Sequence, residues 1–389
     1  MVAACPMPAR RGTPLRVERL AEALCARGHQ VELITYHIAD DEHPLAFPVH
    51  RIFNQRRYWQ MPAGPNVRKL LLYDPMLALK VWQVVAAGGF DVIHAHHIEG
   101  LLVSLPTRLR RRIPLVYDAH TMLRSELPSY GPRLSRWVTR TSGGWLDGWL
   151  PRAADHVAAV TPDIRDRLIQ RYGMHPERIS VVMNGVEADS FRVAEPLSRD
   201  GSVRLFYSGT LAPYQDIDLL LEAFARARHV RKDLRLCLSC SSPFEPYEAQ
   251  AQRLGIRDAI DVIADGFDEL PGRLAASNIA VLPRTRCPGI PQKLLNYMAA
   301  GKAIVSSAGS AKVIEHERTA LIVPNGDAEA FAAALLRLAG DTKFARQLGN
   351  SARDHVEQTY SWELSAHTLE GIYEQVTLRH KGLGSPESV

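Results

Sequence analysis

The sequence predicts an α/β protein with two doubly wound, Rossmann-like domains that face each other across a cleft. Short apolar segments that end in polar loops alternate with helical patterns along nearly the whole chain. This alternation is typical of parallel sheets flanked by helices. One hydrophobic core rarely serves a chain of 389 residues, so two domains are expected. The alternation also restarts after residues 193–202, a polar stretch typical of an interdomain linker.

The first βαβ unit consists of a strand at residues 2–5, a helix at 15–27 and a strand at 30–36. Thr13 is a favourable N-cap for this helix, and Pro14 suits its first position. The loop before the helix lacks the G-x-G-x-x-G pattern, so it gives no evidence for a dinucleotide.

Later elements continue the pattern. Strands are expected at 91–97, 114–120, 157–160, 179–183, 203–207, 234–239, 260–263, 279–282 and 303–305. Helices are expected at 163–172, 217–228, 328–338, 344–358 and 361–379. Thr161, followed by Pro162, is expected to cap the first of them. Ligands of such sheets bind beyond the carboxyl ends of the strands.

This pattern divides the chain into five segments. We expect an N-terminal domain at 1–194, a linker at 195–202 and a C-terminal domain at 203–360. A C-terminal helix at 361–380 is expected to cross back to the N-terminal domain, and the tail at 381–389 is expected to be disordered.

Composition indicates a soluble protein of the cytoplasm. Hydrophobic residues make up 46% of the chain and charged residues 23%, as in globular proteins. Neither a membrane-spanning apolar run nor a signal peptide is recognisable. The five scattered cysteines suit a reducing compartment. Because the strand at 2–5 is so short, we expect that the true N-terminus lies upstream of Met1 or that the sequence is truncated.

The net charge of +5 is unevenly distributed. Residues 101–140 hold eight arginines against two acidic residues, with apolar side chains between them. Such a segment suits an anionic surface, for which a membrane leaflet, a lipid-linked phosphate and nucleic acid are candidates. A solvated helix face is the alternative. We favour peripheral contact with the inner face of a membrane and expect no binding of nucleic acid. The membrane contact is expected to involve four arginines: Arg108, Arg110, Arg111 and Arg112.

The segment 287–307 predicts an anion site. Pro291 suits the first position of a short helix at 292–300, which Gly301 ends. Lys293 and Asn296 share one face near the helix start, where free N–H groups and the helix dipole favour an anion. We expect a phosphorylated ligand there; an ordinary sheet-flanking helix with solvated polar residues is the alternative.

No metal site is predicted. His94, His96 and His97 form an H-x-H-H cluster, but no carboxylate is spaced along the sequence to complete a ligand set, so cleft lining or core is the preferred interpretation. Cys237 and Cys240 lie on one predicted strand without a second ligand pair, which makes a metal or redox role improbable.

Several motifs in this order resemble those of the family 4 glycosyltransferases, and the resemblance covers residues 6–376. They are RGTPLRVERLAEALCARGHQVELIT at 11–35, VYDAH at 116–120, MNGVEADSF at 183–191, YSGTLAPYQDIDLLLEAF at 207–224 and PQKLLNYMAAGKAIV at 291–305.

The resemblance implies a retaining enzyme of the two-domain GT-B fold. Such enzymes move a sugar from a nucleotide diphosphosugar to an acceptor hydroxyl, usually without a metal or a cofactor. The donor lies on the C-terminal domain and the acceptor on the N-terminal one. The departing diphosphate requires cations, and the oxocarbenium-like sugar requires a dry cleft.

Donor residues implied by the resemblance come from four segments of the C-terminal domain. These segments supply Gly209, Thr210 and Gln215; Gly266 and Phe267; Gly289 and Ile290; and Lys293 with Asn296. The family usually has cations at positions 210 and 215, glutamates at 288 and 296, and an acidic residue at 312. Here these positions hold Thr210, Gln215, Pro288, Asn296 and Lys312. We favour a diverged enzyme with its own donor geometry; a loss of activity is the alternative.

On the N-terminal domain, the resemblance places His120 next to the donor sugar, where a neutral imidazole orients donor and acceptor; a strand-end histidine bonded to backbone is the alternative. Gly12 and Thr13 lie on the loop that faces the donor. Arg16 is expected to reach an acceptor phosphate. Asn184 either borders the cleft or forms a structural turn.

The leading hypothesis is therefore a membrane-associated glycosyltransferase that acts on a lipid-linked or saccharide acceptor in surface polysaccharide or glycolipid synthesis. The alternatives are another GT-B enzyme, such as a sugar-nucleotide epimerase, and a non-catalytic partner of another glycosyltransferase.

Overall fold

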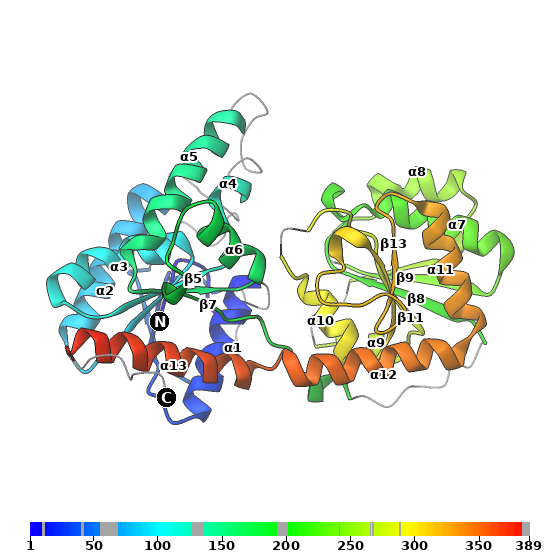
Figure 1. Ribbon diagram of the computed structural model, residues 1–389. Coiled ribbons are helices and arrows are strands. Elements are labelled where there is room, and N and C mark those ends of the chain that lie inside the picture. Colours follow the sequence, from blue (N-terminus) through cyan, green and yellow to red (C-terminus); the bar gives the residue numbers. More distant parts are fainter. Residues whose placement is uncertain are drawn as a thin grey trace. The chain divides into compact units, whose positions relative to one another are not determined.

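The computed structural model describes residues 1–9, 12–39, 43–54, 69–126, 136–192, 201–240, 242–264, 266, 268–287 and 289–382. The chain forms two compact units (Figure 1), Met1–Asn184 with Trp362–Val389 and Gly185–Ser361. Most of the predicted linker at 195–202 and of the predicted tail at 381–389 lies outside the described residues.

The first unit is built on a parallel sheet with the strand order β3-β2-β1-β4-β5-β6-β7. Its strands are β1 (Val2–Ala3), β2 (Leu33–Thr35), β3 (Val49–Arg51), β4 (Ile93–His96), β5 (Leu115–Ala119), β6 (His156–Ala159) and β7 (Ile179–Val181). Its main helices are α1 (Gly12–Ala26), α2 (Asp74–Ala86) with the preceding π-helix η1 (Lys69–Tyr73), α3 (His97–Arg111), α4 (Leu123–Glu126), α5 (Arg136–Trp149), α6 (Pro162–Gln170) and α13 (Trp362–His380).

The second unit is built on a parallel sheet with the strand order β10-β9-β8-β11-β12-β13. Its strands are β8 (Val203–Ser208), β9 (Leu234–Ser239), β10 (Ile260–Ile263), β11 (Ile279–Leu282), β12 (Ala303–Ser307) and β13 (Leu321–Val323). Its main helices are α7 (Ile217–Val230), α8 (Glu245–Arg253), α9 (Leu270–Ala275), α10 (Gln292–Ala299), α11 (Ala328–Gly340) and α12 (Thr342–Thr359).

The predicted fold class is confirmed. Both units are Rossmann-like, with a parallel sheet between layers of helices (Figure 1). The C-terminal helix α13 belongs to the first unit, where it packs along α1, so the predicted return of the chain end is also confirmed. Among the described residues, no helix has both the length and the apolar character that crossing a bilayer requires.

Burial explains why the central strands read as continuous apolar runs. All residues of β11 and β12 are buried, because helices cover both faces of each sheet. The short edge strands β3 and β13 carry only three residues each, and β3 is only half-buried. Neither was predicted, since so few residues give no recognisable periodicity.

The residues at two helix starts have other roles than predicted. Helix α1 begins at Gly12, three residues before the predicted range 15–27 and with φ of +33°, so Thr13 lies in the first turn instead of capping it. Helix α10 begins at Gln292, with Pro291 as its extended N-cap. The predicted Thr161 cap of α6 is confirmed, because its hydroxyl accepts the N–H of Ile164 at 3.3 Å, and Gly301 has the positive φ of +63° expected at a helix end.

Each sheet has one point where the strand order reverses direction. In the first unit it lies between β1 and β4, and in the second between β8 and β11. At such a point the loops that follow the two strands diverge to opposite faces of the sheet and leave a crevice, where ligands of open α/β sheets bind. The candidate sites are therefore expected at the carboxyl ends of these strands.

Candidate active site

Three polar side chains meet at the carboxyl edge of the first sheet. His120 follows β5, His97 begins α3 and Thr13 lies in the first turn of α1. The Thr13 hydroxyl is 3.3 Å from His120 Nδ1 and 3.1 Å from His97 Nε2. The two imidazoles stack with centroids 4.7 Å apart. Because a hydroxyl both donates and accepts, Thr13 can fix the orientation of both rings.

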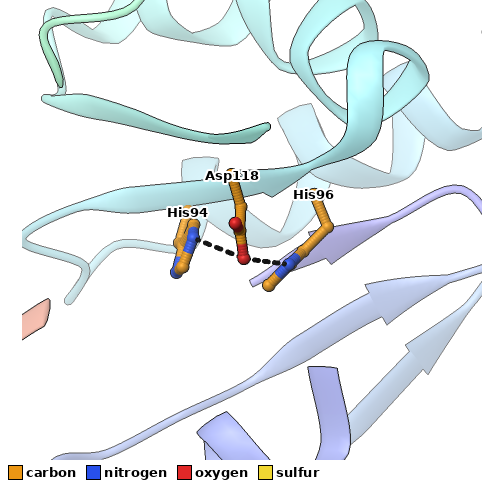
Figure 2. A group of neighbouring side chains, drawn as sticks. All are labelled: His94, His96 and Asp118. Atoms are coloured by element: carbon orange, nitrogen blue, oxygen red, sulfur yellow. Dashed lines mark ion pairs between the residues drawn. The ribbon is translucent and has the colours of Figure 1, made fainter. Parts of the chain in front are cut away.

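Behind Thr13, His97 and His120 lies a fully buried carboxylate. Asp118 of β5 lies between His94 and His96 of β4 (Figure 2), 3.6 Å from His94 Nε2 and 3.1 Å from His96 Nδ1. His96 Nδ1 is also 3.3 Å from His120 Nε2, which joins the buried carboxylate group to His120. His94 Nδ1 contacts the Tyr373 hydroxyl of α13 at 2.6 Å.

Arg16 supplies the positive charge for this carboxylate. Its guanidinium donates to both oxygens of Asp118, at 2.9 and 3.1 Å, in the bidentate geometry that makes such pairs strong. It also donates to the carbonyls of Val182 and Met183 and to Asn184 Oδ1. The side chain is only 2% exposed.

Arg16 therefore does not have the role expected of it. We expected this side chain to reach an acceptor phosphate, but its hydrogen bonds and its burial commit it to the interior. Asn184 accepts one of these bonds at 2.9 Å, so its amide oxygen holds the turn after β7. Gly12 lies directly before the group formed by Thr13, His97 and His120.

Burial keeps the histidines neutral. Loss of hydration lowers the pKa of His120 to about 3, although the nearby Asp118 charge acts in the opposite direction. Burial likewise lowers the pKa of His94 and His96. For Asp118 burial favours the neutral acid, but the charge of Arg16 and hydrogen bonds from the histidines hold its pKa well below its usual value.

The sequence interpretation that no carboxylate accompanies the H-x-H-H cluster is wrong. His94, His96 and Asp118 place one ligand atom each within 4.8 Å of one another. The donor set nevertheless fits a metal poorly, because Arg16 already neutralises Asp118 through a bidentate ion pair. A second cation at this carboxylate would face the guanidinium at short range. This group is better described as a buried ion pair with neutral histidines.

The candidate donor residues of the second unit gather where β8 ends. Gly209 follows β8 with φ of +122°, and a Cβ at this position would lie 2.6 Å from Lys293 Nζ. The Lys293 ammonium therefore lies directly over the glycine backbone. It is 4.1 Å from the centroid of the Tyr207 ring and 3.4 Å from Gln215 Oε1. Burial lowers the pKa of Lys293 to about 7, and the charge of Arg284 adds to this effect.

Thr210 and Tyr214 border the same loop, with their hydroxyls 3.4 Å apart. Tyr207 donates its hydroxyl to the Thr210 carbonyl at 2.8 Å. Sequence reasoning missed Arg284, whose guanidinium carbon lies 4.9 Å from the Tyr214 centroid. A signal was available, because this arginine follows the apolar strand β11 almost directly.

The other predicted donor residues occupy the same unit. Asn296 of α10 is 4% exposed, and Gly289 and Ile290 are half-buried before that helix. Gly266 follows β10, and a Cβ there would lie 2.9 Å from Glu269 Oε2. Phe267 and Pro288 lie outside the described residues.

Two family models match the chain. The model for "Glycosyltransferase Family 4" matches residues 11–190, and the model for "Glycosyl transferases group 1" matches residues 202–341. Together they cover most of both units.

Curated proteins similar to the chain include two kinds of enzyme. A D-inositol 3-phosphate glycosyltransferase of Kribbella flavida is 28% identical over 318 residues, which cover 75% of this chain and 72% of that protein. An alpha-maltose-1-phosphate synthase of Mycolicibacterium smegmatis is 26% identical over 346 residues, which cover 80% of this chain and 86% of that protein.

Similar solved structures share the fold. Sucrose-phosphate synthase from Thermosynechococcus elongatus superposes with a TM-score of 0.79 at 20% identity, over 97% of this chain and 98% of that one. Anabaena HepE in complex with UDP and glucose superposes with a TM-score of 0.75 at 18% identity, over 96% and 98%.

The burial of Arg16 generates a stability prediction. Arg16→Leu leaves the Asp118 carboxylate buried without its cation, which we expect to cost about 3–5 kcal/mol of unfolding free energy. Arg19→Leu, on the same helix, disrupts a partly exposed ion pair with Glu22 and should cost about 1 kcal/mol or less. Thermal unfolding of the two variants measures the difference.

The double variant Arg16→Leu/Asp118→Asn should recover part of the loss, because it removes the unpaired charge. If Arg16→Leu were as stable as Arg19→Leu and lost only activity, Arg16 would contact a substrate after all.

Proposed function

The chain belongs to glycosyltransferase family 4, and we propose that it transfers a sugar from a nucleotide diphosphosugar to an acceptor hydroxyl with retention of configuration. The observation that carries this proposal is the pair of polar groups at the two strand-order reversals. One presents the neutral His120 imidazole, and the other presents Lys293 over the Gly209 backbone. Transfer from a nucleotide diphosphosugar is favoured by a cation at the departing diphosphate, and a neutral polar group at the sugar does not oppose the positive charge that develops there.

The donor residues follow from this proposal. Lys293 neutralises the developing charge of the diphosphate. Gly209, whose φ of +122° is rarely adopted by residues with a side chain, lets the loop backbone approach it. Thr210 and Gln215 line the same loop. Asn296 takes the position of a ribose contact, for which its amide can donate and accept hydrogen bonds. Gly266, Gly289 and Ile290 complete the proposed donor surface among the described residues.

His120 acts on the sugar as a neutral hydrogen-bonding group in this proposal. Its ring is held by the Thr13 hydroxyl on one side and faces the buried His96 and Asp118 on the other. A low pKa suits the role, because a protonated imidazole would repel the positive charge that develops on the sugar. Gly12 and Thr13 border the space in front of the ring.

We propose that the acceptor is lipid-linked or a saccharide, in surface polysaccharide or glycolipid synthesis at a membrane. The carboxyl edge of the first sheet offers support, since Phe53 after β3 and Leu70 and Leu71 before α2 are 76%, 62% and 70% exposed. The Tyr36 hydroxyl following β2 donates to Asp74 at 2.5 Å, which fixes the start of α2 at this edge. Apolar side chains there suit a lipid-linked molecule.

The arginines contribute differently from what the sequence indicated. Arg108 pairs with Asp155 at 2.6 Å and is therefore not available to an anionic surface. Arg110, Arg111 and Arg112 are exposed beside Leu109. They end α3, at the amino-terminal edge of the sheet and thus opposite His120. We propose that these three residues contact anionic lipid and that the apolar carboxyl edge receives the acceptor.

A second acceptor class is favoured by the similarity to a D-inositol 3-phosphate glycosyltransferase and an alpha-maltose-1-phosphate synthase. Both names point to a small phosphorylated sugar or polyol. Neither relative is a sugar-nucleotide epimerase or a non-catalytic partner, so these alternatives gain no support.

The test of the function is a donor panel. The purified protein is incubated with UDP-, GDP- and ADP-sugars, and donor hydrolysis or transfer is measured with lipid-linked, saccharide and sugar-phosphate acceptors. Binding of at least one of UDP, GDP and ADP at micromolar to millimolar affinity is expected. No binding and no turnover across the panel would overturn the proposal.

His120→Ala should lower turnover about a hundredfold or more while nucleotide affinity stays nearly unchanged, because a transition-state contact is lost and ground-state binding is not. His156→Ala is the control: this histidine is buried in the same sheet, but it begins β6 at the opposite edge. Equal loss of turnover and of nucleotide binding in His120→Ala would argue for a structural role.

The membrane contact predicts a charge-dependent interaction with vesicles. The protein should sediment with anionic liposomes at low salt and not with neutral ones. Arg110→Glu/Arg111→Glu/Arg112→Glu should weaken this binding about a hundredfold, since each basic residue near an anionic surface contributes about 1 kcal/mol. A protein that stays in the supernatant with anionic liposomes at low salt would contradict the proposal and favour a small phosphorylated acceptor.

A further inference from the structure

The crevice at the strand-order reversal of the second unit is lined by two loops. One follows β8 and begins at Gly209; the other follows β11 and carries residues 283–287. Lys293, in the first turn of α10, lies over the first loop. The first loop supplies the glycine, but it carries no cation between Gly209 and Asp216. The positive charge at this crevice comes from the second loop and the helix after it.

Two cations at this crevice, Lys293 and Arg284, have no carboxylate partner among the described residues. Lys293 lies over the ring of Tyr207 at 4.1 Å, and Arg284 lies over the ring of Tyr214 at 4.9 Å. Arg284 Nε donates to the Arg286 carbonyl at 2.8 Å. Neither forms an ion pair within the part of the chain that the structure describes. An aromatic face holds a cation in place without neutralising it, so both charges stay available to an anion.

The backbone that carries Arg284 is fixed from two sides. Asp216 accepts hydrogen bonds from the backbone N–H and the hydroxyl of Thr285, at 2.6 and 2.7 Å. The Ser310 hydroxyl donates to the Arg284 carbonyl at 2.7 Å. Gly309 packs so closely that a Cβ there would lie 1.7 Å from the Thr285 carbonyl oxygen. The carboxylate of Asp216, the nearby acidic side chain of the first loop, is thus hydrogen-bonded to the second loop.

We propose that Arg284 and Lys293 together bind the diphosphate of the nucleotide donor, with Arg284 as a second cation that the motifs of this chain did not indicate. A diphosphate diester carries two negative charges, and two cations at one crevice match them. Arg284 adds the planar donor geometry that suits phosphate oxygens, while Lys293 adds a point charge near the Gly209 backbone. This inference rests on the proposed function, because it assigns the diphosphate to that same donor.

Binding measurements on the full-length protein test the pair. Isothermal titration with UDP, GDP and ADP first identifies the diphosphate that wild-type protein binds most tightly. Arg284→Ala and Lys293→Ala should each weaken its affinity about tenfold or more, in line with the loss of a charged hydrogen bond. The corresponding nucleoside monophosphate should lose less affinity in each variant, because fewer phosphate contacts are removed.

Arg286→Ala is the matched control. It removes the same charge two residues away, from an exposed side chain, and should leave the affinity within about twofold, because exposed charges are screened by solvent. Unchanged affinity in both Arg284→Ala and Lys293→Ala would overturn the inference and leave the function standing. Equal losses in Arg284→Ala and Arg286→Ala would also overturn it, since a general charge effect would then suffice. Wild-type protein that binds none of the three diphosphates would instead overturn the proposed function.

The protonation of Lys293 gives an independent measurement. The groups that face it are Arg284, whose charge lowers its pKa, Cys287, which raises it, and the uncharged side chains of Tyr207 and Gln215. With a pKa of about 7, the free amine loses its proton as the pH rises. The bound diphosphate favours the protonated form, so affinity must fall between pH 7 and pH 9.

The affinity of the wild-type protein for the diphosphate is expected to fall about tenfold or more between pH 7 and pH 9. Lys293→Arg keeps its charge over this range and should bind with little pH dependence. A wild-type affinity that does not change between pH 7 and pH 9 would contradict direct contact between Lys293 and the diphosphate.

Discussion

The buried ion pair between Arg16 and Asp118 is the interaction on which the first unit depends. It joins residues 102 positions apart, and the same guanidinium holds the carbonyls of Val182 and Met183. One side chain thus ties helix α1 to the middle of the sheet and to the segment after β7. Because both charges are fully desolvated, neither partner is replaceable alone. The histidines around the pair stay neutral, which keeps the edge that carries His120 free of additional positive charge.

The second unit handles charge in the opposite way. There the cations at the strand-order reversal lie over tyrosine rings, and the nearby carboxylate of Asp216 is taken up by Thr285. A cation that is paired in the protein must lose its partner before it can bind an anion. Lys293 and Arg284 have no such cost, although burial makes the lysine easier to deprotonate. At the strand-order reversal of the first unit the histidines are therefore neutral, whereas at that of the second unit Lys293 and Arg284 carry positive charge that no carboxylate neutralises within the described residues.

Sequence patterns predicted the parts of this arrangement that depend on local order. The alternation of strands and helices predicted both sheets, the Thr161 cap and the position of Gly301, because caps and periodicity act over a few residues. The burial of the Arg16 side chain could not be predicted. Whether an arginine at a helix start faces solvent or a buried carboxylate depends on Asp118, which only the completed sheet brings near. The carboxylate between His94 and His96 was missed for the same reason.

The return of helix α13 to the first unit has a consequence for synthesis. The second unit is one continuous stretch, Gly185–Ser361, whereas the first requires Trp362–Val389 for completion. Domains usually fold as their chain leaves the ribosome, but here the inserted unit is complete before the earlier one. Until Tyr373 reaches His94 and Ser365 reaches the Met183 carbonyl, the surface beneath α13 is uncovered. Loss of α13 would therefore expose the core cluster that its apolar residues form with α1, β5 and β6.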